Sequence, residues 1–259
     1  MSDTYARVMR ATDGPGDRPA ARTRAPRRPT AVPDSAAGIS VLTEVSLNTA
    51  HDESSAADSR AEAAFAAAVA AFATGQELQA RDGLEFEAVP APKRLAPYAT
   101  AVAATVQRGD VDVAWGRLVL LYDPDGQDGW EGCFRIVAYV RADIEPEMAA
   151  DPLLGEVGWS WLAEALDAQV PGYTAPSGTV TRVITEGFGA KQDEIPLTGF
   201  ELRASWSPTG PGYQRGSAAA GDPGALDLPA HVAAWCDCMT TAAGLEPPGT
   251  RALHQPGRG

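Results

Sequence analysis

The chain has 259 residues and a formal net charge of −13, and residues 59–245 hold more than twice as many acidic as basic side chains. Such an excess of negative charge repels phosphate backbones, so nucleic acid is not an expected partner of this central part. The three cysteines do not form a disulfide framework, and the chain has neither a signal-peptide pattern nor an apolar run of about 18 residues. We therefore expect a reduced, cytoplasmic protein that does not contact the membrane.

Composition divides the chain into three parts. Residues 1–58 are rich in Ala, Arg, Pro, Asp and Ser, which predicts a disordered N-terminal extension with one short candidate element at 38–47. Residues 246–259 are predicted to form a second disordered tail. Residues 59–245 are long enough to fold as one domain with its own core.

The first part of the domain is predicted to contain a helix, a strand and a second helix. The first helix starts at Asp58 or Ser59 and ends at Gly75, because a capping residue precedes it and glycine is a common stop signal. Residues 84–89 alternate between apolar and acidic side chains, which predicts a half-buried strand. Residues 95–108 are predicted to form the second helix. Its apolar stripe is Leu95, Tyr98, Val102 and Val106.

The middle of the domain is predicted to be a hairpin followed by a long helix. Strands at 116–122 and 134–141 flank the turn Asp123–Gly129, whose Asp, Pro and Gly residues are typical of turns. The helix at 152–169 follows Asp151 and Pro152, a favoured start. Its apolar face is broad, so we expect it to be the central helix of the fold. The residues of that face are Leu154, Val157, Trp159, Trp161, Leu162, Ala165 and Leu166.

The last part is predicted to contain two more strands and a final helix. Residues 171–178 are expected to be a loop, followed by strands at 179–186 and 199–207, a mobile loop at 208–226 and a helix from Asp227 to Gly244. The fold class is then α+β, with a mostly antiparallel five-stranded sheet packed by helices in the order α-β-α-β-β-α-β-β-α.

Histidine and cysteine give little support for catalysis. His51 and His254 fall in the predicted tails, and His231 is a single histidine in the first turn of a helix, where a surface or boundary role is more common. Cys236 and Cys238 are two residues apart on a helix, so they point in different directions and do not form a metal pair. No catalytic residue, cofactor or metal is therefore predicted.

Two acidic clusters each have two interpretations. The turn Asp123–Gly129 suggests calcium, but it lacks the spacing of a calcium-binding loop, so a hairpin turn is favoured. A second cluster precedes a helix and could gather Mg²⁺, although acidic residues there also complement the helix dipole, which is the favoured explanation. This second cluster is Asp143, Glu145, Glu147 and Asp151.

Arginines recur on the predicted strands, and some lie opposite the apolar faces. The full set is Arg117, Arg135, Arg141, Arg182 and Arg203. One interpretation is a ladder of cross-strand pairs with Glu85, Glu87 and Glu201, which we favour. The other is an exposed groove for an anion or an acidic peptide. The predicted ligand or partner face consists of Arg135, Tyr139, Arg141 and Arg203.

Several long motifs resemble one family. They are RLAPYA at 94–99, GRLVLLYDPDGQDGWEGCFRIVAYVRADIEPEMAADPLL at 116–154, WSW at 159–161, SGTVTR at 177–182 and ELRASW at 201–206. Over about residues 60–245 the chain resembles the actinobacterial family of uncharacterised proteins known as domain of unknown function number three thousand. The resemblance implies a bacterial cytosolic protein, and it implies no activity, ligand or catalytic residue. The N-terminal extension is not expected to be shared.

Two functions from different classes follow. With the helix at 95–108 set aside, the element order is similar to the secretion-chaperone-like α+β fold, whose members bind peptides or pair with themselves; this is an analogy of fold. We first expect a non-catalytic protein-binding or regulatory module that uses a sheet face or edge, with an unknown protein partner or a homodimer. The alternative is a small enzyme that uses Asp, Glu and Arg side chains on an acidic or anionic substrate. A deep pocket of buried acids would favour the enzyme, and a flat, partly apolar face near Trp130, Tyr139 or Trp206 would favour the binding module.

Overall fold

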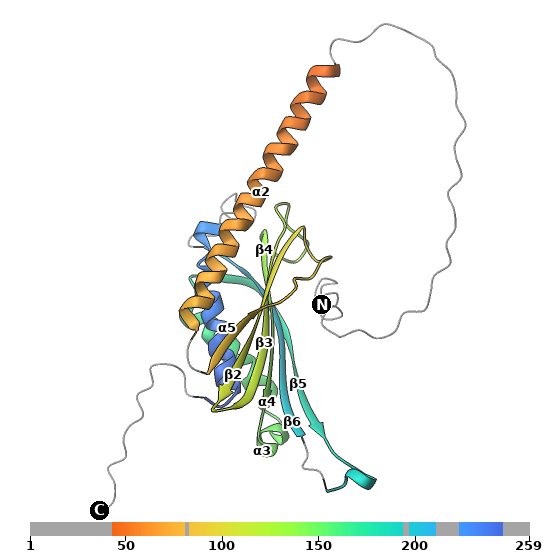
Figure 1. Ribbon diagram of the computed structural model, residues 1–259, viewed down its shortest axis with the longest axis vertical. Coiled ribbons are helices and arrows are strands. Elements are labelled where there is room, and N and C mark those ends of the chain that lie inside the picture. Colours follow the sequence, from red (N-terminus) through yellow and green to blue (C-terminus); the bar gives the residue numbers. More distant parts are fainter. Residues whose placement is uncertain (1–42, 81–82, 194–196, 211–222, 246–259) are drawn as a thin grey trace, which may run out of the picture.

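The computed structural model describes residues 43–80, 83–193, 197–210 and 223–245. Within these ranges, one antiparallel sheet of six strands is covered on one face by helices (Figure 1). The strands are β1 (Leu84–Ala88), β2 (Tyr98–Arg108), β3 (Val111–Tyr122), β4 (Phe134–Asp143), β5 (Tyr173–Thr185) and β6 (Leu197–Pro208). The helices of more than one turn are α2 (Thr43–Gln79), α3 (Pro146–Ala150), α4 (Leu154–Gln169) and α5 (Leu228–Ala242). The α+β class is confirmed.

The prediction of five strands is wrong, because the segment expected to be a helix at 95–108 contains strand β2. Its apolar residues recur every fourth position from Tyr98 to Val106, and a period of four places residues on one side of a strand as well as of a helix. β2 pairs with β3 along its length and with β1 from Val102 to Val106. These two neighbours supply the hydrogen bonds, so tertiary pairing overrides the helix propensity of its alanines.

The sheet order is β1-β2-β3-β4-β6-β5, so β6 lies between β4 and β5. The chain leaves β4, passes through α3 and α4, forms β5 at the edge and returns beside β4 as β6. The predicted loop at 171–178 is also wrong, since β5 begins at Tyr173 and its pairing is irregular between Thr174 and Ser177. That irregularity, next to Pro176, hid the strand from a pattern of alternating residues.

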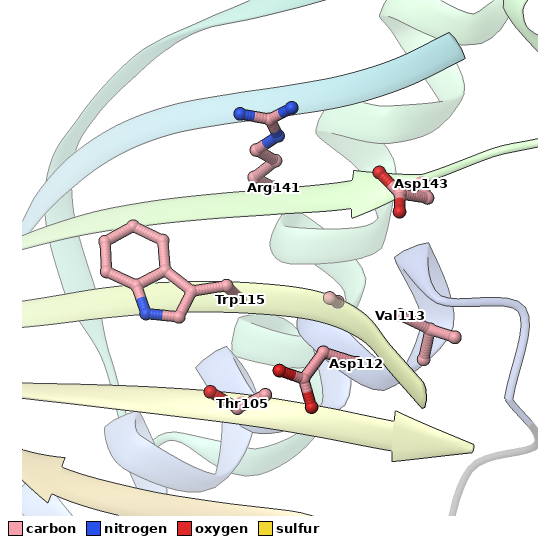
Figure 2. Close-up of a pocket in the computed structure, with 7 residues that line it drawn as sticks. Thr105, Asp112, Val113, Trp115, Arg141 and Asp143 are labelled. Carbon is pink, nitrogen blue, oxygen red and sulfur yellow. The ribbon is translucent and has the colours of Figure 1, made fainter. Parts of the chain in front are cut away.

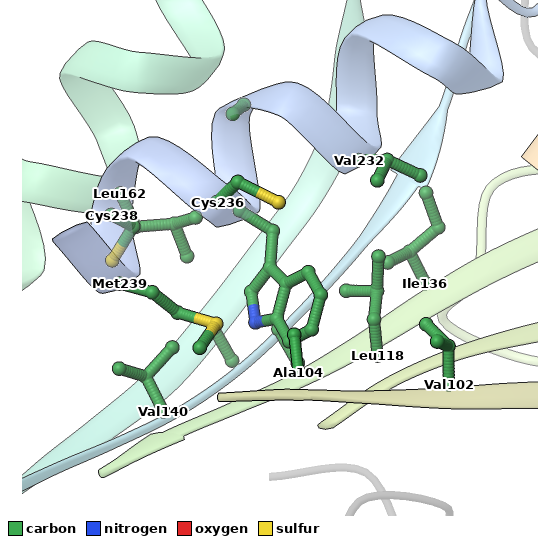
Figure 3. Packing of buried hydrophobic residues seen from close by; sticks show 14 of the residues in the cluster. Val102, Ala104, Leu118, Ile136, Val140, Leu162, Val232, Cys236, Cys238 and Met239 are labelled. Atoms are coloured by element: carbon green, nitrogen blue, oxygen red, sulfur yellow. The ribbon is translucent and has the colours of Figure 1, made fainter. Parts of the chain in front are cut away.

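Helix α5, and not α4, is the central helix. It contacts β3, β4 and β6 beneath it, and α2 and α4 pack beside it (Figure 1). Figure 3 shows Val232, Cys236 and Met239 of α5 above the apolar face of the sheet, close to Leu118 and Ile136. Most of its residues are buried, including Trp235 with no exposed surface. α5 therefore organises the core.

The buried stripe of α4 differs from the expected one. Leu154, Gly158, Leu162 and Leu166 are buried, whereas Val157 is exposed. A spacing of four residues throughout follows one row of the helix surface. α4 packs beside α5 and against β5, and Gly158 of this row faces the Phe200 ring of β6. The composition of α4 indicated a broad apolar face, but the neighbours decided which row is buried.

Helix α2 extends past both ends of the predicted first helix. It begins at Thr43, before Asp58, and it continues through Gly75 to Gln79. Gly75 lies within the helix and does not end it. A Cβ at this position would lie 2.9 Å from Pro229 Cα and Val232 Cβ of α5. This glycine permits close packing of two helices, and the helix end lies further along the chain.

The remaining predictions of disorder lie largely outside the described residues. These are residues 1–42, the greater part of the loop at 208–226, and the tail at 246–259. The candidate element at 38–47 is described only from Thr43, where α2 begins. No helix in the described ranges combines the length and the apolar character needed to cross a bilayer.

Gly116 tests how closely α5 must approach the sheet. A Cβ at Gly116 would lie 2.6 Å from Met239 Sδ and 2.7 Å from Trp235 Cζ2, whereas one at Gly155 in α4 would meet nothing within 4 Å. We expect Gly116→Ala to lower the free energy of unfolding by about 1–3 kcal/mol through overpacking. Gly155→Ala should raise it by up to about 1 kcal/mol through helix propensity. Urea denaturation measures both, and equal effects of the two variants would contradict close packing at Gly116.

Candidate functional site

Within the part of the chain that the structure describes, the face of the sheet opposite the helices is covered at one end. There, Leu95 and Trp130 pack over the side chains of Val119, Leu121 and Val137 to form a small second core. Trp130 is 1% exposed and therefore belongs to this core. The part of the same face nearer the start of β3 carries polar and aromatic side chains.

The strand register places these side chains in two adjacent rows. In one row Trp115 is opposite Arg141, which is opposite Glu201. In the next row, two residues along each strand, Arg117 is opposite Tyr139, which is opposite Arg203. Residues two apart on a strand share a face, so all six lie together. We call Trp115, Arg117, Tyr139, Arg141, Glu201 and Arg203 the open-face cluster.

Tyr139 is the centre of the open-face cluster. Its ring meets the Trp115 ring edge to face, with centroids 5.5 Å apart and planes at 62°, and the Arg203 guanidinium lies 5.5 Å from its centroid. Arg203 Nη2 also forms an ion pair with Glu201 Oε2 at 3.1 Å. Burial, and then the charge of Glu201 and a hydrogen bond to it, raise the pKa of Tyr139. Tyr139 is thus a neutral, positioned ring.

Arg141 is the most accessible cation of the open-face cluster. It lines a hollow of about 360 Å³ together with Trp115, Asp143, Thr105 and Asp112, and Figure 2 shows its guanidinium standing away from the strand. Among the described residues, no carboxylate forms an ion pair with Arg141. Trp115 is 42% exposed. A cation and an indole are therefore presented to solvent side by side.

Arg117 is held more tightly. Its Nη2 donates to the carbonyl oxygen of Pro90, and its buried Nε has no hydrogen-bond partner among the described residues. Burial lowers the pKa of Arg117. Arg117 therefore joins the segment after β1 to the centre of the sheet and leaves one buried donor unsatisfied, a state that costs free energy unless another group supplies an acceptor.

Arg135 is on the same face of β4 as Tyr139 and Arg141, but it does not join them. It is 7% exposed, and Nη2 donates to Ser205 Oγ at 2.7 Å and to Ser177 Oγ at 3.3 Å. Nη1 donates to Ser207 Oγ at 3.3 Å. Burial lowers the pKa of Arg135 to about 10, and the charge of Glu131 partly opposes that shift. The structure places this predicted member of the partner face inside the fold, as a link between β4, β5 and β6.

Among the arginines and glutamates of the predicted cross-strand ladder, the ion pair that forms lies within one strand. Glu201 is opposite Arg141 in the register, yet its carboxylate pairs with Arg203 on its own strand. Glu85 and Glu87 are opposite Thr105 and Ala103, so neither faces an arginine on β2. Arg182 Nη1 donates to the carbonyl oxygen of Asp151 at 3.0 Å, on the helix side of the sheet.

Trp115 is the member of the open-face cluster that sequence reasoning missed. The predicted strand at 116–122 does not include Trp115, whereas β3 begins at Val111. Trp115 and Arg117 continue the odd-numbered side of that strand, and this parity was the available signal. Trp206, expected near a binding face, is completely buried on the other side of the sheet.

One aspartate in each acidic cluster stabilises the local chain path. Asp123 Oδ1 accepts from the Asp125 amide, and Asp123 Oδ2 accepts from Gln127 Nε2, which fixes the hairpin turn. Asp151 Oδ1 accepts from the Leu153 amide just before α4. In the parts of the chain that the structure describes, no three His, Cys, Asp or Glu residues converge as a metal site.

His231 and the α5 thiols belong to the core. His231 Nδ1 accepts a hydrogen bond from Trp206 Nε1 at 3.1 Å, while no group in the described ranges forms a hydrogen bond with its buried Nε2. Burial lowers the pKa of His231 to about 3. Cys236 and Cys238 are both buried, and burial, followed by the charge of Asp237, raises the pKa of Cys238 to about 12. His231 and Cys238 therefore stay neutral near pH 7.

The fold and the open-face cluster define a single-sheet α+β protein with helices on one face and an arginine-rich opposite face. The family model described as "Protein of unknown function (DUF3000)" matches residues 61–251, and the chain belongs to this family. The resemblance seen in the sequence motifs is thereby confirmed. No curated protein and no solved structure matches the chain.

Truncation of Arg135 and of Arg141 should affect the free energy of unfolding to very different extents. Arg135→Ala removes the partner of three serine hydroxyls and leaves a buried gap, so we expect a loss of about 3 kcal/mol in the free energy of unfolding. Arg141→Ala should change it by less than about 0.5 kcal/mol, because the side chain is exposed. Urea denaturation of both variants tests this, and a stable Arg135→Ala protein would show that the serine network contributes little.

His231 should make stability depend on pH. Its pKa is near 6.5 when unfolded and about 3 when folded. The contribution of His231 to the free energy of unfolding is therefore complete above pH 6.5. It is lost as the pH falls, because His231 takes up a proton in the unfolded state and not in the folded state. Between pH 7.5 and 5 the wild type should lose about 2 kcal/mol more than His231→Gln. Urea denaturation at both pH values measures the difference, and parallel losses would contradict it.

Proposed function

We propose that the protein is a non-catalytic binding module, and that the open-face cluster docks an acidic segment of a partner protein. The observation that carries this proposal is Arg141 exposed beside Trp115, with the Tyr139–Arg203 pair in the adjacent row. The domain is strongly acidic overall, whereas the open-face cluster has three arginines and one glutamate, with Asp112 and Asp143 lining the hollow beside Arg141. An acidic segment is the chemistry that complements these arginines.

The aromatic side chains of the open-face cluster also favour binding to a protein. Tryptophan, tyrosine and arginine are the residues most enriched among those that dominate binding energies at protein interfaces. Tyr139 is held by Trp115 on one side and by Arg203 on another, so these groups are already positioned and little side-chain entropy is lost on binding. An extended segment that carries acidic and aromatic side chains on alternate positions would fit two rows of a sheet.

The enzyme alternative has less support. Catalysis by carboxylates is favoured by burial, which raises their pKa into a useful range. The two acids that line the hollow, Asp112 and Asp143, are both exposed, and the hollow opens onto the sheet face (Figure 2). A surface of this form is better suited to contact than to enclosing a substrate.

A pair of peptides tests the proposed function. The probe is a short peptide of alternating glutamate and tyrosine, and its matched control has glutamine in place of glutamate. We expect calorimetry to detect binding of the acidic peptide, with an affinity that falls as salt is added. Arg141→Ala and Trp115→Ala should each raise the dissociation constant about tenfold or more, since an exposed charged or aromatic contact is lost.

Arg94→Ala is the control variant, because Arg94 is exposed and lies outside the open-face cluster. It should bind the acidic peptide as the wild type does. Equal affinity for the two peptides would contradict recognition of acidic groups. An unchanged affinity in Arg141→Ala and Trp115→Ala would place any binding elsewhere on the molecule.

A further inference from the structure

The two edges of the sheet differ in how they are protected. β1 has five residues, carries exposed Glu85 and Glu87, and is followed by Pro90, all of which discourage pairing with another strand. β5 has 13 residues, and no described strand pairs with its outer edge. Its last four residues, Arg182–Thr185, include no proline or lysine. A long strand edge of this kind is a template for a further strand.

The end of the β5–β6 hairpin also exposes apolar side chains. Ile184 is 54% exposed, Phe188 is 79% exposed and Leu197 is 71% exposed. Figure 1 shows that this end of the hairpin reaches past the neighbouring strands. Leu153 is also exposed, in the link between α3 and α4, whose helices both pack against β5. Apolar surface that gathers at one edge marks an interaction site.

The sequence at this edge is complementary to itself. Residues 182–186 are the last four residues of β5 and the residue after it, and they read Arg-Val-Ile-Thr-Glu. An antiparallel copy centred on Ile184 that continues the pairing by this one residue brings Arg182 opposite Glu186 of the other copy. Val183 is then opposite Thr185, and the two Ile184 side chains meet on the twofold axis. Opposite residues in an antiparallel pair lie about 4.5–5.5 Å apart between Cβ atoms, which suits each of these pairs.

We infer that a second copy of this chain pairs with the β5 edge, forming a twofold dimer through Arg182–Glu186 with Ile184 on the axis. The dimer has two Arg182–Glu186 pairs, because a twofold interface repeats every contact. Arg182 and Glu186 are both exposed, and the Arg182 guanidinium, whose Nη1 donates to the Asp151 carbonyl oxygen, has further N–H groups for the second copy. The two sheets become one continuous sheet, and the open-face clusters lie on the same side of it.

Exchange of the two charges tests the dimer. Sedimentation velocity of the full chain over a range of concentrations should show a species of twice the 27.0 kDa chain mass. Arg182→Glu and Glu186→Arg each place like charges opposite one another twice, and each should raise the dimer dissociation constant about tenfold or more, equivalent to about 1.4 kcal/mol. The double variant restores the pairing and should restore the dimer.

Two further variants complete the test. Ile184→Asp places two like charges on the axis and should give a monomer, with thermal unfolding used to verify that the chain is folded. Arg94→Glu has the same charge change as Arg182→Glu at an exposed position before β2, and its mass should equal that of the wild type. A wild-type monomer at every concentration would overturn the inference. So would a dimer unaffected by Arg182→Glu and Ile184→Asp, or a double variant no better than the single ones.

Discussion

The packing of α5 onto the sheet is the interaction on which the rest of the structure depends. Trp235 and Met239 occupy the space that Gly116 leaves open, and Trp235 Nε1 donates to the carbonyl oxygen of Tyr139 at 3.4 Å. The other two long helices pack beside α5, so the entire helical layer is on one face. Because the helices take that face, the strands present their charged and aromatic residues on the opposite one.

Because of this asymmetry, the chemically identical residues Arg135 and Arg141 lie in different environments. They point to the same face of β4, six positions apart in the chain. Arg135 lies at the end that Trp130 and the serines of β5 and β6 cover, and it becomes a structural donor. Arg141 lies at the uncovered end and remains in solvent. Local sequence does not distinguish them, since the difference comes from a turn and a distant hairpin.

The open face and the β5 edge of the same sheet offer two different kinds of contact. The face offers side chains, namely guanidiniums and aromatic rings, which select a partner by charge and shape. The edge offers backbone groups, which select another strand. Neither surface requires buried acids or a metal, and His231, Cys236 and Cys238 all lie within the core.

The sequence by itself determined the α+β class, the β3–β4 hairpin, the α4 and α5 segments and the family, because these depend on short-range periodicity, turn residues and long motifs. It also indicated Tyr139, Arg141 and Arg203 as neighbours, since alternation fixes the face of a strand. Only the tertiary structure decided that 98–108 is a strand, that β6 lies beside β4, that Trp115 joins the open-face cluster and that Arg135 is buried. Each of these depends on which distant segments supply hydrogen bonds or cover a side chain, and alanine-rich or alternating sequences are compatible with either outcome.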